Sequence, residues 1–173
     1  MKKPLKIFLP LTVLILLSFL ITKIIFRINH KNEVTKNIKK IPEFSFEDIN
    51  GVLFNNHNLK KNTPTIFLYF NTECEFCNTE VEIIKKNIEQ FKNTQLIFIS
   101  FESPLKIKKF AENYQLLNHD NIHFIYDKQV VFSKTFDVKA FPTIVIYNNQ
   151  QQLLEKIKGQ VKIDHILKKI NKQ

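Results

Sequence analysis

The sequence predicts an α/β fold, with parallel strands joined by helices and one transmembrane helix ahead of them. Two runs of β-branched and aromatic residues, at 65–70 and 96–101, have the composition of buried strands. Each run is followed by residues with a helical apolar period, and this alternation implies parallel strands joined by crossovers. The chain has 173 residues, 44% of them hydrophobic, which suits one domain and a short additional segment.

One apolar segment near the N-terminus is long enough to cross a membrane. Residues 7–22 carry no charge, and if the Lys23 side chain extends to the bilayer surface the apolar stretch reaches Phe26. A helix of that length spans a hydrocarbon core of about 30 Å. The alternative is a cleaved signal peptide, but the small residues that cleavage requires do not follow the apolar run. We therefore expect an uncleaved anchor at residues 7–26, after a basic flank at residues 1–6.

The positive charge of the chain lies mainly around this anchor. The formal net charge is +10, of which residues 1–40 contribute +8. The domain that follows is close to neutral, so it lacks the basic face that nucleic-acid binding requires. Basic residues after the anchor outnumber those before it, which by the positive-inside rule would keep the domain in the cytoplasm. The usual topology of an N-terminal anchor favours the extracytoplasmic side, and we expect the domain there.

A polar segment rich in Lys and Asn separates the anchor from the domain. It covers residues 27–41 and predicts a solvated tether, so the domain is expected at residues 42–173. Two short strand-like runs, at 44–47 and 52–54, flank Asn50-Gly51, which is a strong hairpin turn signal. The domain is therefore expected to begin with a β-hairpin.

The rest of the domain continues the alternation of strand and helix. After a strand at residues 65–71, apolar residues recur at steps of four and three and predict a helix: Cys77, Val81, Ile84, Ile88 and Phe91. Ser103-Pro104 supplies an N-cap and a first-turn proline for the helix after the second strand. The remaining elements are expected as strands at 122–126, 143–147 and 153–158, a short helix near 129–136, and a final helix with an apolar face at Ile163, Ile166, Leu167 and Ile170.

Cys74-Glu75-Phe76-Cys77 contains the only two cysteines, at the point where the first strand turns into its helix. The free N–H groups and the positive dipole end of a helix N-terminus favour an anion such as a thiolate. Cys74 lies just before the first turn and is expected to be the nucleophile, whereas Cys77 lies on the inward stripe. The pair predicts reversible thiol–disulfide chemistry with no cofactor besides the Cys74–Cys77 disulfide.

Three features resemble the thioredoxin superfamily: Cys-x-x-Cys at a strand-to-helix turn, Phe141-Pro142-Thr143 before a strand, and a final hairpin with a helix. Within it, the chain is similar to the membrane-tethered redoxins that include the thiol-disulfide reductases of cytochrome c maturation. The resemblance covers about residues 41–173 and implies a thioredoxin-like three-layer sandwich, with helices on both faces of a central mixed sheet. It also implies a cis bond before Pro142 and a backbone at Phe141 that pairs with the extended substrate chain.

The resemblance implies a thiol-disulfide oxidoreductase. The Cys74 thiolate would attack a disulfide of a protein substrate, and Cys77 would then attack Cys74 and release the reduced partner. An upstream thiol donor would restore the pair. Glu80 matches an acidic residue of the cytochrome c maturation reductases that is thought to assist proton movement at the buried cysteine. The alternative is an ordinary acid of the first turn, favoured by the helix dipole.

Two residues beside the cysteines depart from the family pattern. Glu73 stands where thioredoxins usually have tryptophan, and Phe76 stands where many relatives have proline. Glu75 and Phe76, between the cysteines, are expected to contact the substrate. Glu73, Glu75 and Glu80 together surround Cys74 with negative charge, which disfavours its thiolate. Because a stabilised thiolate makes a strong oxidant in this class, the sequence predicts a reductant.

The peroxiredoxins share this fold and need separate consideration. Their peroxide-reducing cysteine is preceded at three positions by threonine and is assisted by an arginine. Here Asn71 occupies that position, and the sole arginine, Arg27, lies beside the anchor. The sequence therefore disfavours peroxidase chemistry.

Three other interpretations stay open. Cys-x-x-Cys could bind zinc together with His119 and His123, although the 41 residues between the two pairs far exceed the spacing of a compact zinc finger. The cysteines could form a purely structural disulfide, although so short a loop gains little stability from it. The domain could also be a non-catalytic tethered binding module in which the cysteines are incidental.

Overall fold

The computed structural model describes residues 4–171. They form two compact units, the first ending at Asn37 and the second beginning at Ile38. The first unit is one helix, α1 (Pro4–Asn37), and its segment Pro10–Asn37 is long and apolar enough to cross a membrane. A signal sequence has the same properties.

The helix α1 continues through residues 27–37, where the sequence predicts a polar tether. No glycine or proline occurs at residues 11–41, and each residue added to an existing helix gains a hydrogen bond. The second unit begins earlier than predicted, because Ile38 is buried and its carbonyl oxygen accepts a hydrogen bond from the Tyr147 hydroxyl at 2.9 Å. Residues 1–3 of the predicted basic flank lie outside the described residues.

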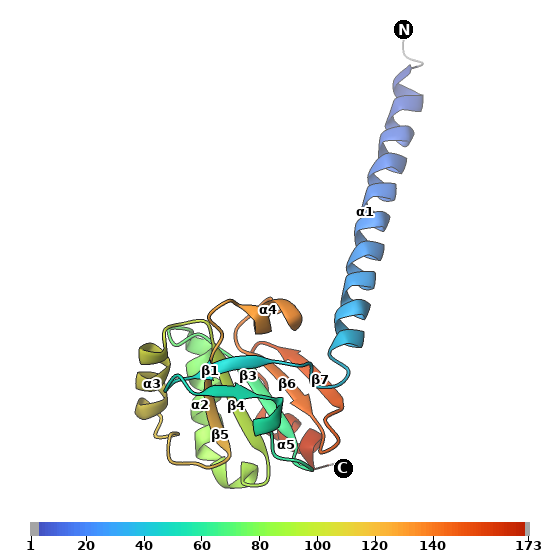
Figure 1. The fold of residues 1–173 in the computed structure, drawn as a ribbon. Helices are drawn as coiled ribbons and strands as arrows, with labels where there is room; N and C mark the ends of the chain where they lie inside the picture. Colours follow the sequence, from blue (N-terminus) through green and yellow to red (C-terminus); the bar gives the residue numbers. More distant parts are fainter. Residues whose placement is uncertain (1–3, 172–173) are drawn as a thin grey trace. The chain divides into compact units, whose positions relative to one another are not determined.

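A seven-stranded mixed sheet forms the centre of the second unit, in the order β2-β1-β5-β4-β3-β6-β7 (Figure 1). Strands β3, β4 and β5 are parallel, whereas β1, β2, β6 and β7 pair antiparallel with their neighbours. The parallel strands and the antiparallel hairpins at each end agree with the predicted mixed sheet. The strands are β1 (Ser45–Asp48), β2 (Leu53–Asn55), β3 (Thr65–Tyr69), β4 (Gln95–Ser100), β5 (Ile122–Tyr126), β6 (Thr143–Tyr147) and β7 (Leu153–Lys158).

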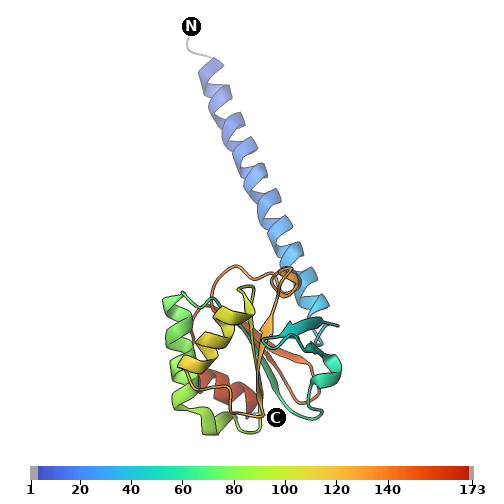
Figure 2. The same cartoon turned by 60° about the vertical axis from the view of Figure 1, so that its left-hand side comes forward.

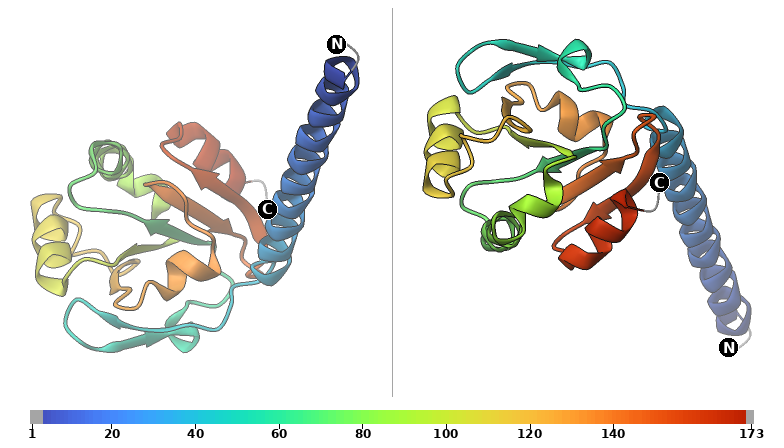
Figure 3. Two further views of the ribbon diagram at one scale, coloured as in Figure 1. Left: turned by 90° about the horizontal axis from the view of Figure 1, so that it is seen from above. Right: turned by 90° about the horizontal axis from the view of Figure 1, so that it is seen from below.

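Two further layers cover the sheet. Helices α2, α3 and α5 lie on one face (Figure 2), and α4 lies with the β1–β2 hairpin on the other (Figure 3). The predicted three-layer sandwich is thus confirmed. The helices of this unit are α2 (Glu75–Lys86), α3 (Pro104–Asn113), α4 (Val131–Thr135) and α5 (Ile163–Ile170), with short 3₁₀ turns η1 (Asn56–Asn58) and η2 (Ile88–Phe91).

The two faces of the sheet are packed differently. On the α2 side, aliphatic and aromatic strand residues form one cluster with the inward stripes of α2, α3 and α5. On the other side the packing is mainly aromatic: the Phe67 ring lies 5.6 Å from Phe132 and 6.2 Å from Phe136, measured between ring centroids. Burial on both faces explains why the central strands are almost continuously apolar in the sequence.

Helix α2 is shorter than its apolar stripe predicts. It ends at Lys86, and Asn87 leaves the helical conformation while its side-chain amide donates to the Ile83 carbonyl at 2.8 Å. Phe91 still reaches the core, but it does so from η2. The predicted N-cap of α3 holds as a position, since Ser103 precedes Pro104, but the Ser103 side chain makes no capping hydrogen bond.

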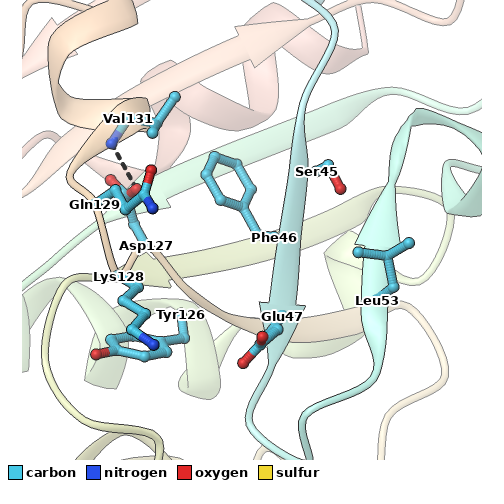
Figure 4. A pocket seen from close by; sticks show the side chains of 9 residues that line it. All are labelled: Ser45, Phe46, Glu47, Leu53, Tyr126, Asp127, Lys128, Gln129 and Val131. Carbon is cyan, nitrogen blue, oxygen red and sulfur yellow. Dashed lines mark hydrogen bonds between the residues drawn. The ribbon is translucent and has the colours of Figure 1, made fainter.

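The turn from β5 into α4 contains a strained β-branched residue. Val130 has a φ of 51°, in the left-handed region that β-branched residues rarely adopt. The turn is held by the buried Asp127, whose Oδ1 accepts from the Val131 N–H at 2.7 Å (Figure 4). Its Oδ2 accepts from the Tyr69 hydroxyl at 3.2 Å. Phe46 of β1 points toward this turn across a cavity of about 230 Å³, and neither cysteine lines that cavity.

We expect Val130→Asn to raise the free energy of unfolding by about 1 kcal/mol, because asparagine tolerates the left-handed region. Val138→Asn is the matched control: Val138 is also half-buried but has no positive φ, so the same change should destabilise the domain. Urea denaturation of the full chain in detergent measures both. A loss of stability in Val130→Asn equal to that of the control would contradict strain at this position.

Candidate active site

The two cysteines lie at the edge of the sheet where the parallel strands β3 and β4 end. The chain leaves β3 at Tyr69, and Cys74 occupies the N-cap of α2 with an extended backbone. Its side chain is half-buried, whereas Cys77, one turn further on, is fully buried. Both are thiols in the structure. The Cys74 sulfur is therefore accessible to a partner protein, whereas the Cys77 sulfur is shielded from solvent.

Cys77 lies in an environment that opposes ionisation. Burial raises the pKa of the Cys77 thiol well above its usual range, and a backbone hydrogen bond from Asn71 only partly offsets this. The neighbouring Cys74 thiol and the Glu80 carboxyl raise the same pKa further. Cys77 is therefore a protonated thiol at neutral pH, and it needs a base before it can attack a disulfide.

Phe141 and Pro142 lie beside the nucleophile. The Phe141–Pro142 peptide bond is cis, as the resemblance implied. The Cys74 sulfur lies 3.9 Å from the Phe141 carbonyl oxygen, within reach of a weak S–H···O hydrogen bond. The Phe141 ring stacks on Tyr69 at 5.8 Å and lies 6.0 Å from Phe101, between ring centroids.

Glu80 is a buried carboxyl group next to Cys77. It lies on the inward face of α2 beyond the first turn and is 0% exposed, so it is not an ordinary surface acid of a helix N-terminus. Oε2 accepts a hydrogen bond from the Val161 N–H at 3.1 Å, and Oε1 has no hydrogen-bond partner among residues 4–171. Burial raises the pKa of Glu80, and the Val161 hydrogen bond acts in the opposite direction. A buried carboxyl group beside a buried thiol is suited to exchange a proton with it.

The negative charge around Cys74 is smaller than the sequence suggests. The Nζ of Lys106 lies 2.7 Å from a carboxylate oxygen of the exposed Glu73, and this hydrogen bond lowers the pKa of Glu73. Glu80 lies inside the domain beside Cys77, and only Glu75 remains as an exposed acid in the first turn of α2. The predicted acidic surroundings are therefore partly neutralised by a lysine from α3.

Three residues beside the cysteines were not predicted from the sequence: Phe101, Glu102 and Lys106. They follow β4, and their neighbours across the site, Thr72 and Glu73, follow β3. Adjacent parallel strands end at the same edge of a sheet, so the two loops must meet there. The position of this second loop directly after a buried strand was the signal in the sequence that could have predicted these residues.

The cysteine and histidine pairs lie apart. The cysteines follow the carboxyl end of β3, whereas His119 precedes the amino end of the parallel strand β5. His123 lies on the opposite face of the sheet from Cys77, with its ring 4.9 Å from the Phe54 ring, and burial lowers its pKa. These four side chains cannot share one zinc ion. Among the described residues no group of three or more metal-binding side chains gathers elsewhere.

Residues 38–156 match the family model described as the AhpC/TSA family. The chain belongs to the AhpC/TSA family. This match covers more than half of the sequence and nearly all of the sandwich, from the buried Ile38 into β7. It agrees with the resemblance to the thioredoxin superfamily. No curated protein sequence matches this AhpC/TSA member.

Solved structures share the fold of this AhpC/TSA protein at low identity. A secreted Mycobacterium tuberculosis disulfide oxidoreductase homologous to E. coli DsbE is 17% identical, with a TM-score of 0.62 over 73% of this chain and 92% of that one. The exposed lipoprotein thioredoxin Etrx1 of Streptococcus pneumoniae is 14% identical, with a TM-score of 0.59 over 73% and 96%. Peroxidoxin BcpB of M. tuberculosis is 18% identical, with a TM-score of 0.64 over 75% and 92%. The expected class, a thioredoxin-like oxidoreductase, is thus confirmed in family and fold.

Proposed function

We propose that this AhpC/TSA member is a membrane-anchored thiol-disulfide oxidoreductase that reduces disulfides of exported proteins. The observation that carries the proposal is the unequal burial of the two cysteines. Cys74 is partly open at the N-cap of α2, and Cys77 is buried one turn away. An exposed nucleophile with a sheltered second thiol is the arrangement that disulfide exchange requires.

The reaction transfers two electrons from the cysteine pair to the substrate. The Cys74 thiolate attacks one sulfur of the substrate disulfide, that disulfide breaks, and the leaving thiolate takes a proton. Glu80 then accepts the Cys77 proton. The Cys77 thiolate attacks the Cys74 sulfur, the internal disulfide forms, and the second substrate sulfur leaves as a thiolate. An upstream thiol donor reduces the Cys74–Cys77 disulfide for the next cycle.

We assign substrate contact to the residues around the Cys74 sulfur. Phe141 and Pro142 offer backbone that an extended segment could pair with, and Phe141 is held by stacking on Tyr69. Glu75 and Phe76 project from the first turn of α2, with Phe76 63% exposed. The face is completed by Phe101, which is 40% exposed. Exposed aromatic side chains around a nucleophile suit an apolar stretch of polypeptide on either side of the substrate disulfide.

The first unit of the chain is proposed to anchor the domain in a membrane. Support comes from α1, in which Pro10–Asn37 is long and apolar enough to span a bilayer, and from the absence of small residues suited to cleavage after the apolar run. We place the redox domain on the extracytoplasmic side. Disulfide-bonded substrates are common there and rare in the cytosol.

Peroxide reduction is the second function to consider, because the same fold occurs in peroxidoxin BcpB. The residues near Cys74 do not favour it. The chain has a single arginine, Arg27, which lies in α1 and not in the sandwich. Lys106, a cation beside the active-site loop, is paired with Glu73 and Glu102.

One pair of assays separates these functions. We expect the purified full chain in detergent to accelerate the reduction of insulin disulfides by dithiothreitol and to leave hydrogen peroxide consumption at the background rate. Insulin reduction at the background rate, or rapid peroxide consumption dependent on Cys74, would contradict the proposal.

A further inference from the structure

Glu102 is a buried carboxylate in the loop after β4, and it contacts the loop that carries the nucleophile. It is 9% exposed. Its Oε2 accepts from the Thr72 N–H at 2.6 Å, and its Oε1 accepts from the Thr72 hydroxyl at 2.9 Å. Thr72 lies two residues before Cys74. The Glu102 carboxylate therefore holds Thr72 of the active-site loop through two hydrogen bonds.

The charge of Glu102 is compensated within the domain. Lys106 Nζ lies 3.3 Å from Oε1, and the same ammonium group pairs with Glu73 at 2.7 Å. On the other side, the Ser100 hydroxyl lies 3.5 Å from Oε2. Hydrogen bonds to a carboxylate in its ionised form are roughly twice as strong as those between neutral groups.

The loop that Glu102 holds at Thr72 also contacts both cysteines. The Asn71 carbonyl oxygen accepts from the Cys74 N–H at 3.2 Å, and the Asn71 side chain accepts from the Glu73 N–H at 2.9 Å. The Asn71 backbone also forms a hydrogen bond to the Cys77 sulfur. Thr72 lies between these contacts, so its position fixes the path of the chain from β3 to Cys74.

We propose that Glu102 is a positioning residue that holds Cys74 in bonding geometry with Cys77 and so stabilises their disulfide. This inference rests on the proposed function. A disulfide forms more readily when its two thiols are held close together, because less freedom is lost on forming the bond. Loosening the loop lowers the effective concentration of one thiol at the other. The disulfide then becomes easier to reduce, and the domain becomes a weaker reductant.

The test is a redox titration of the full chain in detergent micelles. The protein is equilibrated with mixtures of reduced and oxidised glutathione, and its free thiols are counted by alkylation and mass spectrometry. In Glu102→Ala we expect the equilibrium constant for forming the Cys74–Cys77 disulfide to fall about tenfold, from the loss of two charge-assisted hydrogen bonds. A tenfold fall corresponds to about 30 mV.

Three further variants separate positioning from charge and from folding. Glu102→Gln keeps an acceptor for the Thr72 N–H but removes the charge, and should stay within about threefold of wild type. Thr72→Val removes only the hydroxyl contact and should lower the constant about threefold. Glu112→Ala, an exposed acid on α3, should change nothing. Far-UV circular dichroism checks that each variant is folded.

The titration distinguishes failure of the Glu102 positioning role from failure of the proposed function. An unchanged constant in both Glu102→Ala and Thr72→Val would overturn the positioning role, while a normal wild-type titration would leave the proposed function intact. An equal fall in Glu102→Ala and Glu102→Gln would assign the effect to charge and also overturn the role. If the wild-type chain forms no disulfide in any glutathione mixture, the proposed function itself fails.

Discussion

Replacing Cys74 with serine is expected to lower the rate of insulin disulfide reduction by on the order of 10³-fold or more, to the background rate. A serine hydroxyl is not ionised at neutral pH and cannot form a mixed disulfide, so the first step is lost. Cys74 does not belong to the fully buried core, and the substitution removes little packing. We therefore expect the thermal midpoint of the variant to remain close to that of the wild type.

Cys77→Ser is the matched variant, and it should fail at a different step. The Cys74 thiolate can still attack a substrate disulfide, but no second thiol releases the product, so a mixed disulfide accumulates. Non-reducing gels after incubation with insulin should show the adduct for Cys77→Ser and none for Cys74→Ser. Full reductase activity in Cys74→Ser would contradict the assignment. Adducts of equal yield in the two variants would contradict the order of attack.

Glu80→Gln is expected to slow the release of the mixed disulfide by about 10²-fold at neutral pH, because general-base assistance at a positioned group contributes on that order. Burial raises the pKa of Cys77, so its deprotonation needs the ionised form of Glu80. Since the pKa of Glu80 is itself raised, the wild-type rate should increase as pH rises through that elevated value. The variant should lose this dependence. Stopped-flow measurement of mixed-disulfide decay between about pH 5 and pH 9 tests it.

The same substitution should make the reduced domain more stable. A carboxyl whose pKa is raised by folding stabilises the folded state when protonated, and this contribution is lost as pH rises through the folded-state value. Above that folded-state value the ionised Glu80 is unfavourable, and removing its charge should raise the free energy of unfolding by about 1 kcal/mol. Glu82→Gln is the control on the same helix, because Glu82 is exposed and forms an ion pair with Lys86 at 2.8 Å. The rate of mixed-disulfide decay in Glu82→Gln should match that of the wild type. A Glu80→Gln variant that is fully active would leave Glu80 without a role in catalysis.

Much of the sandwich could be predicted from the sequence because its central strands are buried on both faces. Such strands are almost continuously apolar, so the bounds of β5 and β6 agree with their predictions. Helix ends were harder to predict. Helix α2 ends at Lys86 because the Asn87 side chain bonds back to the backbone, which an apolar stripe does not reveal. Helix α1 extends beyond the apolar segment because no glycine or proline interrupts residues 11–41. The polar composition of residues 27–41, taken alone, predicted a tether.

The site was predictable where it depends on neighbouring residues and not where it depends on distant ones. The Cys-x-x-Cys spacing and the strand-to-helix turn placed both sulfurs correctly at the start of α2. The partner of Glu73, however, is Lys106, 33 positions along the chain, and the partner of Thr72 is Glu102, 30 positions along. These pairs form only because β3 and β4 lie side by side in the sheet. Their effect on the local charge could not be read from the residues around the cysteines.

The most direct test of the account is the reduction potential of the cysteine pair in the wild-type chain. Thiol counting across glutathione and dithiothreitol buffers should give one reversible two-electron transition, with a potential more reducing than about −200 mV, in the range of cellular reductants. Two thiols that stay free under every oxidising buffer would refute the redox function. A potential near about −120 mV, like that of the bacterial periplasmic thiol oxidase, would contradict the reducing direction.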